Sequence, residues 1–355
     1  MKNRVLTLVL ALAFVSSCAL VLMPYTEENF EGAGSFSING YGGQVVNFSG
    51  PVNKVVSMGT AFTSTLDELG CIDQLLYVDS SSKSAGIESI QDFADDRVYT
   101  TSQGEALAQK LAASSDFDET NDVVLIYSYS TGLKTAFDAM PIRYVMFYPQ
   151  SYEDSVQMVT DIGKIMGKET KAAEITAEME GIETYYTDAL TAAGVTEKVN
   201  AVYASYSSNI LKVGNLKSLS VVMLKLAGGL NPADDSTIDA TTYEPVTGFF
   251  LGLEGTGKLD VVFVDPYYSG TAAEFKTLMG ISENVKVVKL TVLENTYGPA
   301  SLKGIEHMAS VMYPEVFGDS GDPDDNGSGD NTMIYVAAGI CVIILIVVAV
   351  VIMRR

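Results

Sequence analysis

The chain has 355 residues and a formal net charge of −22, with 44 acidic side chains against 22 basic ones. Phosphate binding needs clusters of Lys and Arg, and the sequence has none, so we exclude a function in nucleic-acid binding. A disulfide framework or a cysteine metal cluster is excluded too, because Cys18 and Cys341 lie in apolar terminal segments and leave Cys71 as the one cysteine between them. We expect Cys71 to be a buried, small apolar residue.

Residues 1–23 are predicted to be a secretory signal peptide. Lys2 and Arg4 form a basic region, residues 5–15 are apolar, and small residues follow at 17–19. Residues 15–18 also resemble a lipobox, in which Cys18 is lipidated. Cleavage near Ala19, lipidation of Cys18 and retention as a second anchor therefore stay open, and all three place the middle of the chain outside the cell.

The last part of the sequence predicts a membrane anchor. Residues 333–353 carry no charge, and a helix of this length spans roughly 31 Å, which matches the apolar core of a bilayer. Arg354 and Arg355 follow, and basic residues mark the cytoplasmic side. Residues 319–331 are rich in Asp, Gly and Ser and are predicted to be an acidic flexible linker. We thus expect a single-pass protein of the cell membrane whose globular part is extracellular.

Residues 36–160 are predicted to form an N-terminal α/β lobe. Short β-rich runs alternate with helical segments, which is typical of a parallel sheet covered by helices. Residues 123–126 are apolar at every position, as in a strand that is buried on both faces. We expect strands at 55–58, 75–78, 122–127 and 143–147, and helices at 63–69 and 105–113.

Residues 161–194 are predicted to be helical and to join this lobe to a second one. A helix at 151–166 ends before Gly167, and another at 169–193 ends before Gly194. The second helix measures roughly 37 Å, long enough to cross between lobes. Its apolar residues recur every three or four positions and predict one buried stripe: Ala172, Ile175, Met179, Ile182, Tyr186 and Ala189.

Residues 195–318 are predicted to form a C-terminal α/β lobe. Strands are expected at 201–204, 261–264 and 285–290, and helices at 218–227, 272–279 and 302–313. The predicted fold class is therefore α/β, with two small parallel-sheet lobes joined by one long helix, plus a C-terminal transmembrane helix.

Six short segments, in this order along the chain, resemble the class III substrate-binding proteins of ABC importers, which carry ferric siderophores, haem and cobalamin. They are VNKVVS at 52–57, TLDELG at 65–70, IGKIMGKE at 162–169, LAGG at 226–229, LDVVFV at 259–264 and YPEVF at 313–317. The resemblance covers residues 36–318. It implies a binding protein that is not an enzyme and needs no cofactor. Such a protein captures a ferric chelate, haem or corrinoid between its lobes and delivers it to an ABC permease and its ATPase.

Two sequence positions bear on how the protein would dock on a permease to deliver its ligand. In the resembling family a Glu of each lobe docks on the permease. Ser64 stands at the first of these positions, and residues 242–244 are similar to the second motif, which makes Glu244 the docking candidate. The missing Glu leaves an alternative open, namely a membrane-tethered surface sensor or adhesion protein that kept the fold without transport.

Tyrosines gather at the ends of predicted strands and are our candidate ligand-binding residues. Ligands of open α/β sheets bind beyond the carboxyl ends of the strands, so two facing lobes are expected to bring these rings to one cleft. Rings with a polar tip suit a large, partly apolar chelate. Arg143 is added because it can pair with a carboxylate or an anionic chelate. The tyrosines are Tyr127, Tyr129, Tyr148, Tyr203, Tyr206, Tyr267 and Tyr268.

Other chemistries find little support in the sequence. Residues 252–258 have the glycine and lysine spacing of a P-loop, but Leu259 replaces the Ser or Thr that holds Mg²⁺. His307 is the sole histidine, so a multi-histidine metal site is excluded, and we expect it to be a packed or surface side chain. No G-x-S-x-G motif is present.

Overall fold

The computed structural model describes residues 34–318. The predicted signal peptide, the acidic linker at 319–331 and the predicted transmembrane segment at 333–353 lie outside the described residues. Within them, no helix is both long and apolar enough to cross a bilayer.

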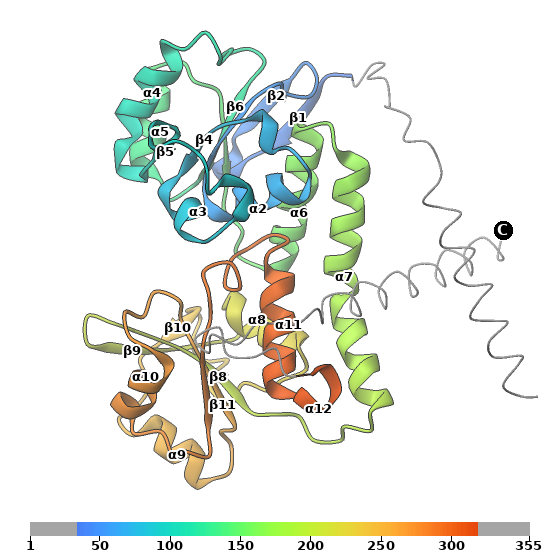
Figure 1. The fold of residues 1–355 in the computed structure, drawn as a ribbon, viewed down its shortest axis with the longest axis vertical. Coiled ribbons are helices and arrows are strands. Elements are labelled where there is room, and N and C mark those ends of the chain that lie inside the picture. The colour runs from blue at the N-terminus through green and yellow to red at the C-terminus, as the bar shows by residue number, and fades with distance from the viewer. Residues whose placement is uncertain (1–33, 319–355) are drawn as a thin grey trace, which may run out of the picture. The chain divides into compact units, whose positions relative to one another are not determined.

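The N-terminal lobe is built on a fully parallel sheet (Figure 1). Its order is β5-β4-β3-β6-β7, which confirms the four expected strands and adds a short edge strand, β5. The strands are β3 (Val55–Met58), β4 (Leu75–Asp79), β5 (Val98–Tyr99), β6 (Val123–Tyr127) and β7 (Tyr144–Phe147).

Helices cover both faces of this sheet, as the uninterrupted apolar strands predict. Val55 and Leu125 pack into one core, whereas Val56 and Val124 pack into a second core on the other face. The helices are α2 (Thr60–Glu68), α3 (Ser80–Ser84), α4 (Gly104–Ala112), α5 (Thr131–Ala139) and α6 (Tyr152–Ile165). Cys71 is fully buried, and burial raises the pKa of its thiol to about 11, in agreement with the expected apolar role.

A hairpin that the sequence analysis did not predict precedes the lobe. It consists of β1 (Phe36–Asn39) and β2 (Val45–Phe48). Between the two strands, the Gln44 amide donates to the carbonyl of Tyr144 at 3.1 Å and accepts from the amide of Met146 at 2.9 Å. The Gln44 side chain thus pairs with the free edge of β7, which otherwise leaves unpaired backbone groups.

The long helix α7 (Glu169–Ala192) runs along both lobes (Figure 1). The predicted stripe is confirmed except at its end, where Leu190 is buried in place of Ala189. Tyr152 of α6 donates a hydrogen bond to the carbonyl of Met179, and Tyr186 packs edge-on against Phe317, with ring centroids 5.0 Å apart. Consequently α7 shares a core with each lobe.

The C-terminal lobe has a sheet with the order β10-β9-β8-β11-β12, in which the three predicted strands are parallel and two strands that were not predicted are added. Strands β8, β11 and β12 are parallel, while β9 and β10 are antiparallel additions at one edge. The reason is a two-residue turn, Ser208 and Asn209, with φ values of 53° and 62°, which folds β9 back on β8. The strands are β8 (Ala201–Ser207), β9 (Ile210–Gly214), β10 (Thr242–Tyr243), β11 (Val261–Val264) and β12 (Lys286–Lys289).

Five helices complete this lobe: α8 (Leu219–Leu226), α9 (Phe249–Gly255), α10 (Ala272–Met279), α11 (Ser301–Met312) and α12 (Pro314–Phe317). The P-loop-like residues 252–258 form the end of α9 and the turn that leads into β11. A phosphate-binding loop has the reverse order, strand before helix, so this position rules out a P-loop.

The loop at residues 291–300, between β12 and α11, reaches from the C-terminal lobe to the N-terminal one (Figure 1). The amide of Gly298 donates to Oγ of Ser155 on α6 at 2.5 Å. Gly298 has a φ of 85°, and a Cβ there would lie 3.0 Å from Oγ1 of Thr65 on α2. The 291–300 loop is therefore a second connection between the lobes, beside α7.

Candidate ligand-binding site

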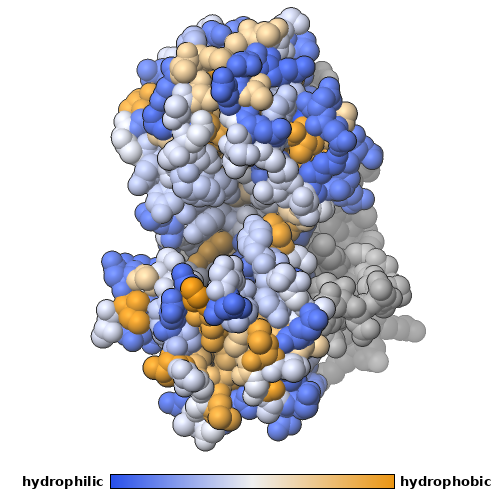
Figure 2. Space-filling model, turned by 90° about the vertical axis from the view of Figure 1, so that its left-hand side faces the viewer, coloured by the Kyte–Doolittle hydropathy of each residue, from blue (hydrophilic) through white to orange (hydrophobic). Residues whose placement is uncertain are grey.

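A cavity of about 610 Å³ lies between the two lobes, a size typical of small-molecule sites. Figure 2 shows the hollow at the waist of the molecule, bordered mostly by residues of intermediate hydropathy. Eleven lining residues come from the N-terminal lobe: Met58, Gly59, Thr60, Asp79, Ser81, Thr101, Tyr127, Tyr129, Tyr148, Pro149 and Gln150. Five come from the C-terminal lobe: Thr241, Tyr267, Asn295, Thr296 and Tyr297.

Most of these residues follow the carboxyl ends of parallel strands. Thr60 follows β3, Asp79 ends β4, and Tyr127 ends β6. On the other lobe, Tyr267 comes shortly after β11 and Tyr297 lies in the loop after β12. The cavity therefore lies where the two sheets direct their carboxyl ends, as expected for open α/β sheets.

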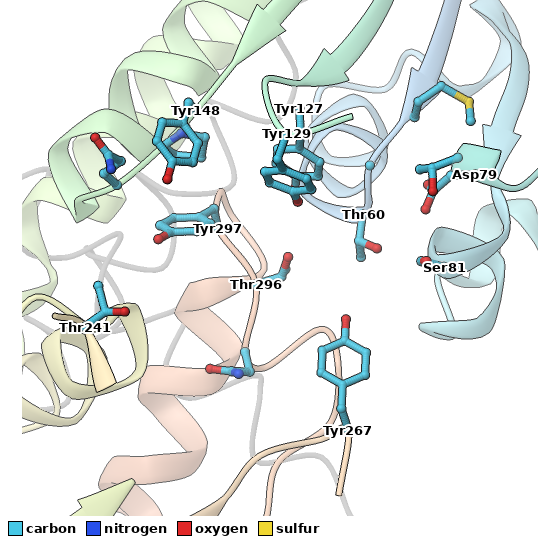
Figure 3. Close-up of a pocket in the computed structure, with 16 residues that line it drawn as sticks. Thr60, Asp79, Ser81, Tyr127, Tyr129, Tyr148, Thr241, Tyr267, Thr296 and Tyr297 are labelled. Carbon is cyan, nitrogen blue, oxygen red and sulfur yellow. The ribbon is translucent and has the colours of Figure 1, made fainter. Parts of the chain in front are cut away.

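Five tyrosines line the cavity, and four of them are sequence candidates: Tyr127, Tyr129, Tyr148 and Tyr267. The rings of Tyr127 and Tyr129 are stacked, with centroids 4.8 Å apart. Figure 3 shows Tyr148 beside Tyr297, and Tyr267 rising from the C-terminal lobe toward Thr60. Both lobes thus contribute tyrosine side chains to the cavity lining.

Gly59 makes room for this aromatic wall. A Cβ at position 59 would lie 2.4 Å from a ring carbon of Tyr127 and 2.8 Å from one of Phe62. Tyr127 in turn packs on Phe62, with centroids 4.4 Å apart. Glycine is required here for space, since the backbone of Gly59 is extended with a φ of −179°.

Four of the cavity tyrosines have raised pKa values, which favours the neutral phenol. Burial raises the pKa of Tyr129, and neighbouring Tyr267 and Asp79 raise it further. Burial also raises the pKa values of Tyr127 and Tyr297, and for the more exposed Tyr267 partial burial acts together with Asp265 and Asp79. These side chains are therefore suited to donate and accept hydrogen bonds, whereas phenolate formation is disfavoured.

Asp79 adds a buried carboxylate to the cavity wall, with only 3% of its surface exposed. Its Oδ1 accepts a hydrogen bond from Ser82. The Ser82 hydroxyl lies 2.9 Å from that of Thr63, which lies 2.7 Å from that of Ser57. Burial raises the pKa of Asp79, while hydrogen bonds from Ser82 and Ser81 act in the opposite direction. Asp79 thus ends a buried polar chain that begins in the core of the sheet.

Three predicted tyrosines lie outside the cavity, so the expectation that all of them line one cleft is corrected for these. Tyr203 is buried within β8, where its hydroxyl donates to the carboxylate of Asp265 and accepts from the amide of Asn295 at 3.0 Å. It therefore supports Asn295, a lining residue, from behind.

Tyr206 and Tyr268 pack against each other with centroids 6.3 Å apart, and Tyr268 also packs on Phe275 in the core of the C-terminal lobe. Tyr268 adjoins Tyr267, but the two side chains differ: Tyr267 is 73% exposed and Tyr268 is 9% exposed. The sequence does not distinguish two neighbouring tyrosines. The local direction of the backbone decides which side chain points into the cavity and which into the core.

Arg143 also lies outside the cavity, which corrects its prediction as a ligand-binding residue. It precedes β7, at the amino end of the sheet, whereas the cavity lies at the carboxyl end. Its Nε donates to the carbonyl of Asp122 at 2.8 Å, and its guanidinium lies over the ring of Phe48. We assign Arg143 a structural role beneath the sheet.

Several lining residues were not among the predicted site residues. Tyr297 lies in a strand-to-helix loop of the same kind as that of Tyr267, so the strand-end rule had the means to find it. Asp79 directly follows the predicted strand at 75–78 and had the same signal, but only aromatic residues were taken as candidates. Thr241, in contrast, carries no signal, because its position depends on the unpredicted strands β9 and β10.

The loop that carries Asn295, Thr296 and Tyr297 is held by a buried pair. Nδ1 of His307 lies 2.9 Å from Oε1 of Glu294, and the two side chains are 6% and 15% exposed. Burial alone raises the pKa of Glu294, but the hydrogen bond and charge of His307, with hydrogen bonds from Thr291, lower it overall. His307, expected to be a packed or surface residue, is packed and attaches the loop to α11.

The two positions considered for permease docking differ in exposure. Glu244 is exposed beside β10 and lines a shallow groove of about 320 Å³. Ser64 is buried in α2 and donates to the carbonyl of Ala61.

In the range 34–318, no three His, Cys, Asp or Glu side chains gather into a group suited to hold a metal ion.

Comparison with known proteins gives the fold a family context. No protein-family model matches the sequence, and no curated protein matches it. Solved structures do match. The petrobactin-binding protein YclQ of Bacillus subtilis superposes with a TM-score of 0.61 at 15% identity, over 78% of this chain and 98% of that one. The periplasmic haem-binding protein HutB of Vibrio cholerae gives a TM-score of 0.59 at 15% identity, over 74% and 99%.

CeuE of Helicobacter pylori, solved as a complex with nickel and histidine, gives a TM-score of 0.60 at 15% identity, over 80% of this chain and 90% of that one. Each match spans both lobes and nearly the whole of the other protein. The part of the chain that the structure describes therefore has the fold of the class III substrate-binding proteins of ABC importers.

Proposed function

We propose that this chain is the extracytoplasmic solute-binding component of an ABC importer and that the cavity captures a ferric chelate, haem or corrinoid. The observation that carries the proposal is the cavity of about 610 Å³ with five tyrosines at the facing strand ends of two lobes. Aromatic rings with polar tips give a large, partly apolar ligand both contact area and hydrogen bonds. The structural relatives include haem-binding and petrobactin-binding proteins, which supports a ligand of this class.

On this proposal the chain is not an enzyme. The two connections between the lobes, α7 and the 291–300 loop, limit their relative movement, so capture needs little closure. Delivery would follow when the lobe tips dock on a permease whose separate ATPase supplies the energy. Glu244 is the proposed docking residue of the C-terminal lobe. A Glu244→Lys variant should bind ligand normally and lose uptake in a reconstituted importer; unchanged uptake would eliminate this role.

The membrane anchor is part of the same proposal. The uncharged residues 333–353, preceded by the acidic linker at 319–331, would tether the lobes to the outer face of the cell membrane. A tether of about a dozen flexible residues keeps a binding protein near its permease at a high effective concentration. This arrangement suits a cell without an outer membrane, from which a free binding protein would diffuse away.

A thermal-shift screen of the purified full-length chain against ferric chelates, haem and corrinoids tests the proposal. A ligand that binds only the folded state raises the Tm, by an amount that grows with ligand concentration over Kd. Tyr129→Ala, which removes a cavity ring, should lower the affinity about tenfold or more. Tyr206→Ala, outside the cavity, is the matched control and should leave it unchanged. No shift with any of these ligands would refute the proposal and favour the sensor or adhesion alternative.

A further inference from the structure

A single carboxylate supplies the formal charge of the cavity lining. Among the sixteen described residues that line it, Asp79 is the only one with a formal charge at neutral pH, and no Lys, Arg or His is among them. Lys83, close to Asp79 in sequence, donates to the carbonyl of Phe93 at 2.7 Å and faces Asp95 at 3.5 Å, so its charge is engaged elsewhere.

Carboxylates also surround the cavity tyrosines from behind. Asp265 accepts from the backbone amide of Tyr267 at 2.8 Å and, through its other oxygen, from the hydroxyl of Tyr203. Burial raises the pKa of Tyr267, and Asp265 and Asp79 raise it further; burial, Tyr148 and Asp154 do the same for Tyr297. The contributions of Asp265, Asp79 and Asp154, unlike that of burial, indicate negative potential in the cavity, and the net charge of −22 adds to it.

Asp79 lines the cavity, so its carboxylate is placed to contact a bound ligand. Its side chain is buried in the wall, held by Ser82, and lies on the same side of the cavity as Ser81 and Thr60 (Figure 3). Within the described range no basic side chain forms an ion pair with it. A buried carboxylate without a cationic partner is costly unless a cation approaches it. The electron-rich faces of neighbouring tyrosines attract the same kind of group.

We propose that the cleft selects metal chelates of neutral or positive net charge, with the carboxylate of Asp79 receiving a cationic group of the ligand and the tyrosine rings packing around it. This inference rests on the proposed function as a chelate-binding protein and names its ligand class. Anionic chelates are disfavoured because the cavity offers no basic group to balance their charge.

The test uses one chelate scaffold at three charges. Ferrioxamine B carries a free ammonium group, its N-acetyl derivative is neutral, and its N-succinyl derivative is anionic. Titration calorimetry with the full-length chain should give the order cationic, then neutral, then anionic, with about 10- to 100-fold between the first and the last, as expected for a charge-assisted contact. A ferric tricatecholate, which is strongly anionic, should bind more weakly than any of them.

Asp79→Asn keeps the shape and the acceptor for Ser82 but removes the charge. It should lower the preference for the cationic over the anionic derivative at least about tenfold, because the charge-assisted contact is lost. A purely structural role of Asp79 would instead weaken all three derivatives equally. Asp92→Asn, an exposed position, is the matched control and should leave the order unchanged.

A second variant keeps the test valid if Asp79→Asn fails to fold. Thr241 is exposed at the cavity edge, so Thr241→Lys adds a positive charge without touching Asp79, and Thr241→Gln controls for size. The lysine variant should favour the anionic derivative relative to the glutamine variant. Tighter binding of anionic than of cationic chelates by the unmodified chain overturns this inference and leaves the proposed function standing. Binding of no chelate at any charge overturns both.

Discussion

The two walls of the cavity are built in different ways. The N-terminal wall is formed by residues that directly follow the strands of one parallel sheet, with hydrophobic cores on both faces. The C-terminal wall depends on the 291–300 loop, which His307 holds from below and Ser155 holds from the opposite lobe. The first wall is thus a property of the sheet, whereas the second exists only while a few tertiary contacts persist. We therefore expect substitutions at the two walls to differ in their effects on stability and on ligand binding.

The largest effect is expected at Gly304 of α11. A Cβ at this position would lie 2.0 Å from the carbonyl oxygen of Glu294 and 2.3 Å from a Met223 methyl carbon. Because a backbone atom of the 291–300 loop has to move, Gly304→Ala should lower the free energy of unfolding by about 3 kcal/mol and weaken ligand binding. Gly181→Ala on α7 has open space and should instead stabilise the chain by about 0.5 to 1 kcal/mol. If the two substitutions changed the free energy of unfolding equally, close packing of the 291–300 loop on α11 would be contradicted.

Gly59 tests the N-terminal wall. Gly59→Ala forces the rings of Tyr127 and Phe62 apart and should cost about 2 kcal/mol of stability, together with a measurable loss of affinity. Gly252→Ala, in open space on α9, is the control for a glycine away from the cavity. Denaturant titration and calorimetry report the two quantities separately. If Gly59→Ala bound ligand as well as the parent, Tyr127 would not be part of the binding surface.

Ser155 tests the contact between the lobes. Ser155→Ala leaves the buried amide of Gly298 without its acceptor and should cost about 1 to 2 kcal/mol. Amide hydrogen exchange should rise in the 291–300 loop and stay unchanged in the strands of the N-terminal lobe. Thr160→Ala removes an exposed hydroxyl that bonds only within α6, and it should affect neither measurement. Unchanged loop exchange in Ser155→Ala would show that the loop is held by α11 alone.

The smallest effect is expected from the charge of Glu294. Its pKa is lower in the folded state than its ordinary value, so its contribution to stability is complete above the ordinary carboxyl range and is lost as the pH falls through the lowered pKa. Glu294→Gln should lower the Tm near neutral pH by about 2 °C, which corresponds to about 1 kcal/mol, and the difference from the parent should shrink in acid. Glu88→Gln, exposed on the N-terminal lobe, is the control. A Tm difference that stays constant across this pH range would exclude the ionised pair.

Local patterns predicted the central parallel strands and the longer helices of both lobes, because buried parallel strands and amphipathic helices each leave a regular spacing of apolar residues. Helices α3, α5 and α9 and strand β5 were not predicted. The resemblance to a binding-protein family rested on short segments such as those at 52–57 and 226–229, and the fold agrees with it. The β1–β2 hairpin and strands β9 and β10 were missed. They are short and partly exposed, so neither leaves a continuous apolar run.

The candidate site shows the same limit. Tyr127, Tyr129, Tyr148 and Tyr267 were predicted from their place at strand ends and line the cavity, since the carboxyl edge of a parallel sheet is determined by chain direction. Tyr203, Tyr206 and Tyr268 met the same criterion and lie elsewhere, because the side of a strand or loop to which a residue points depends on the surrounding packing. Arg143 was chosen for its charge and lies at the opposite, amino end of the sheet.

Periodicity and strand order in the sequence thus determine the two lobes, the long helix and the edge of each sheet where a ligand can bind, because these features follow from local hydrophobic patterns. The approach of the 291–300 loop to Ser155, the burial of Asp79 without a basic partner and the separation of Tyr267 from Tyr268 come from contacts between residues far apart in the chain. Such contacts depend on how whole elements pack, and they decide the charge and shape of the cleft.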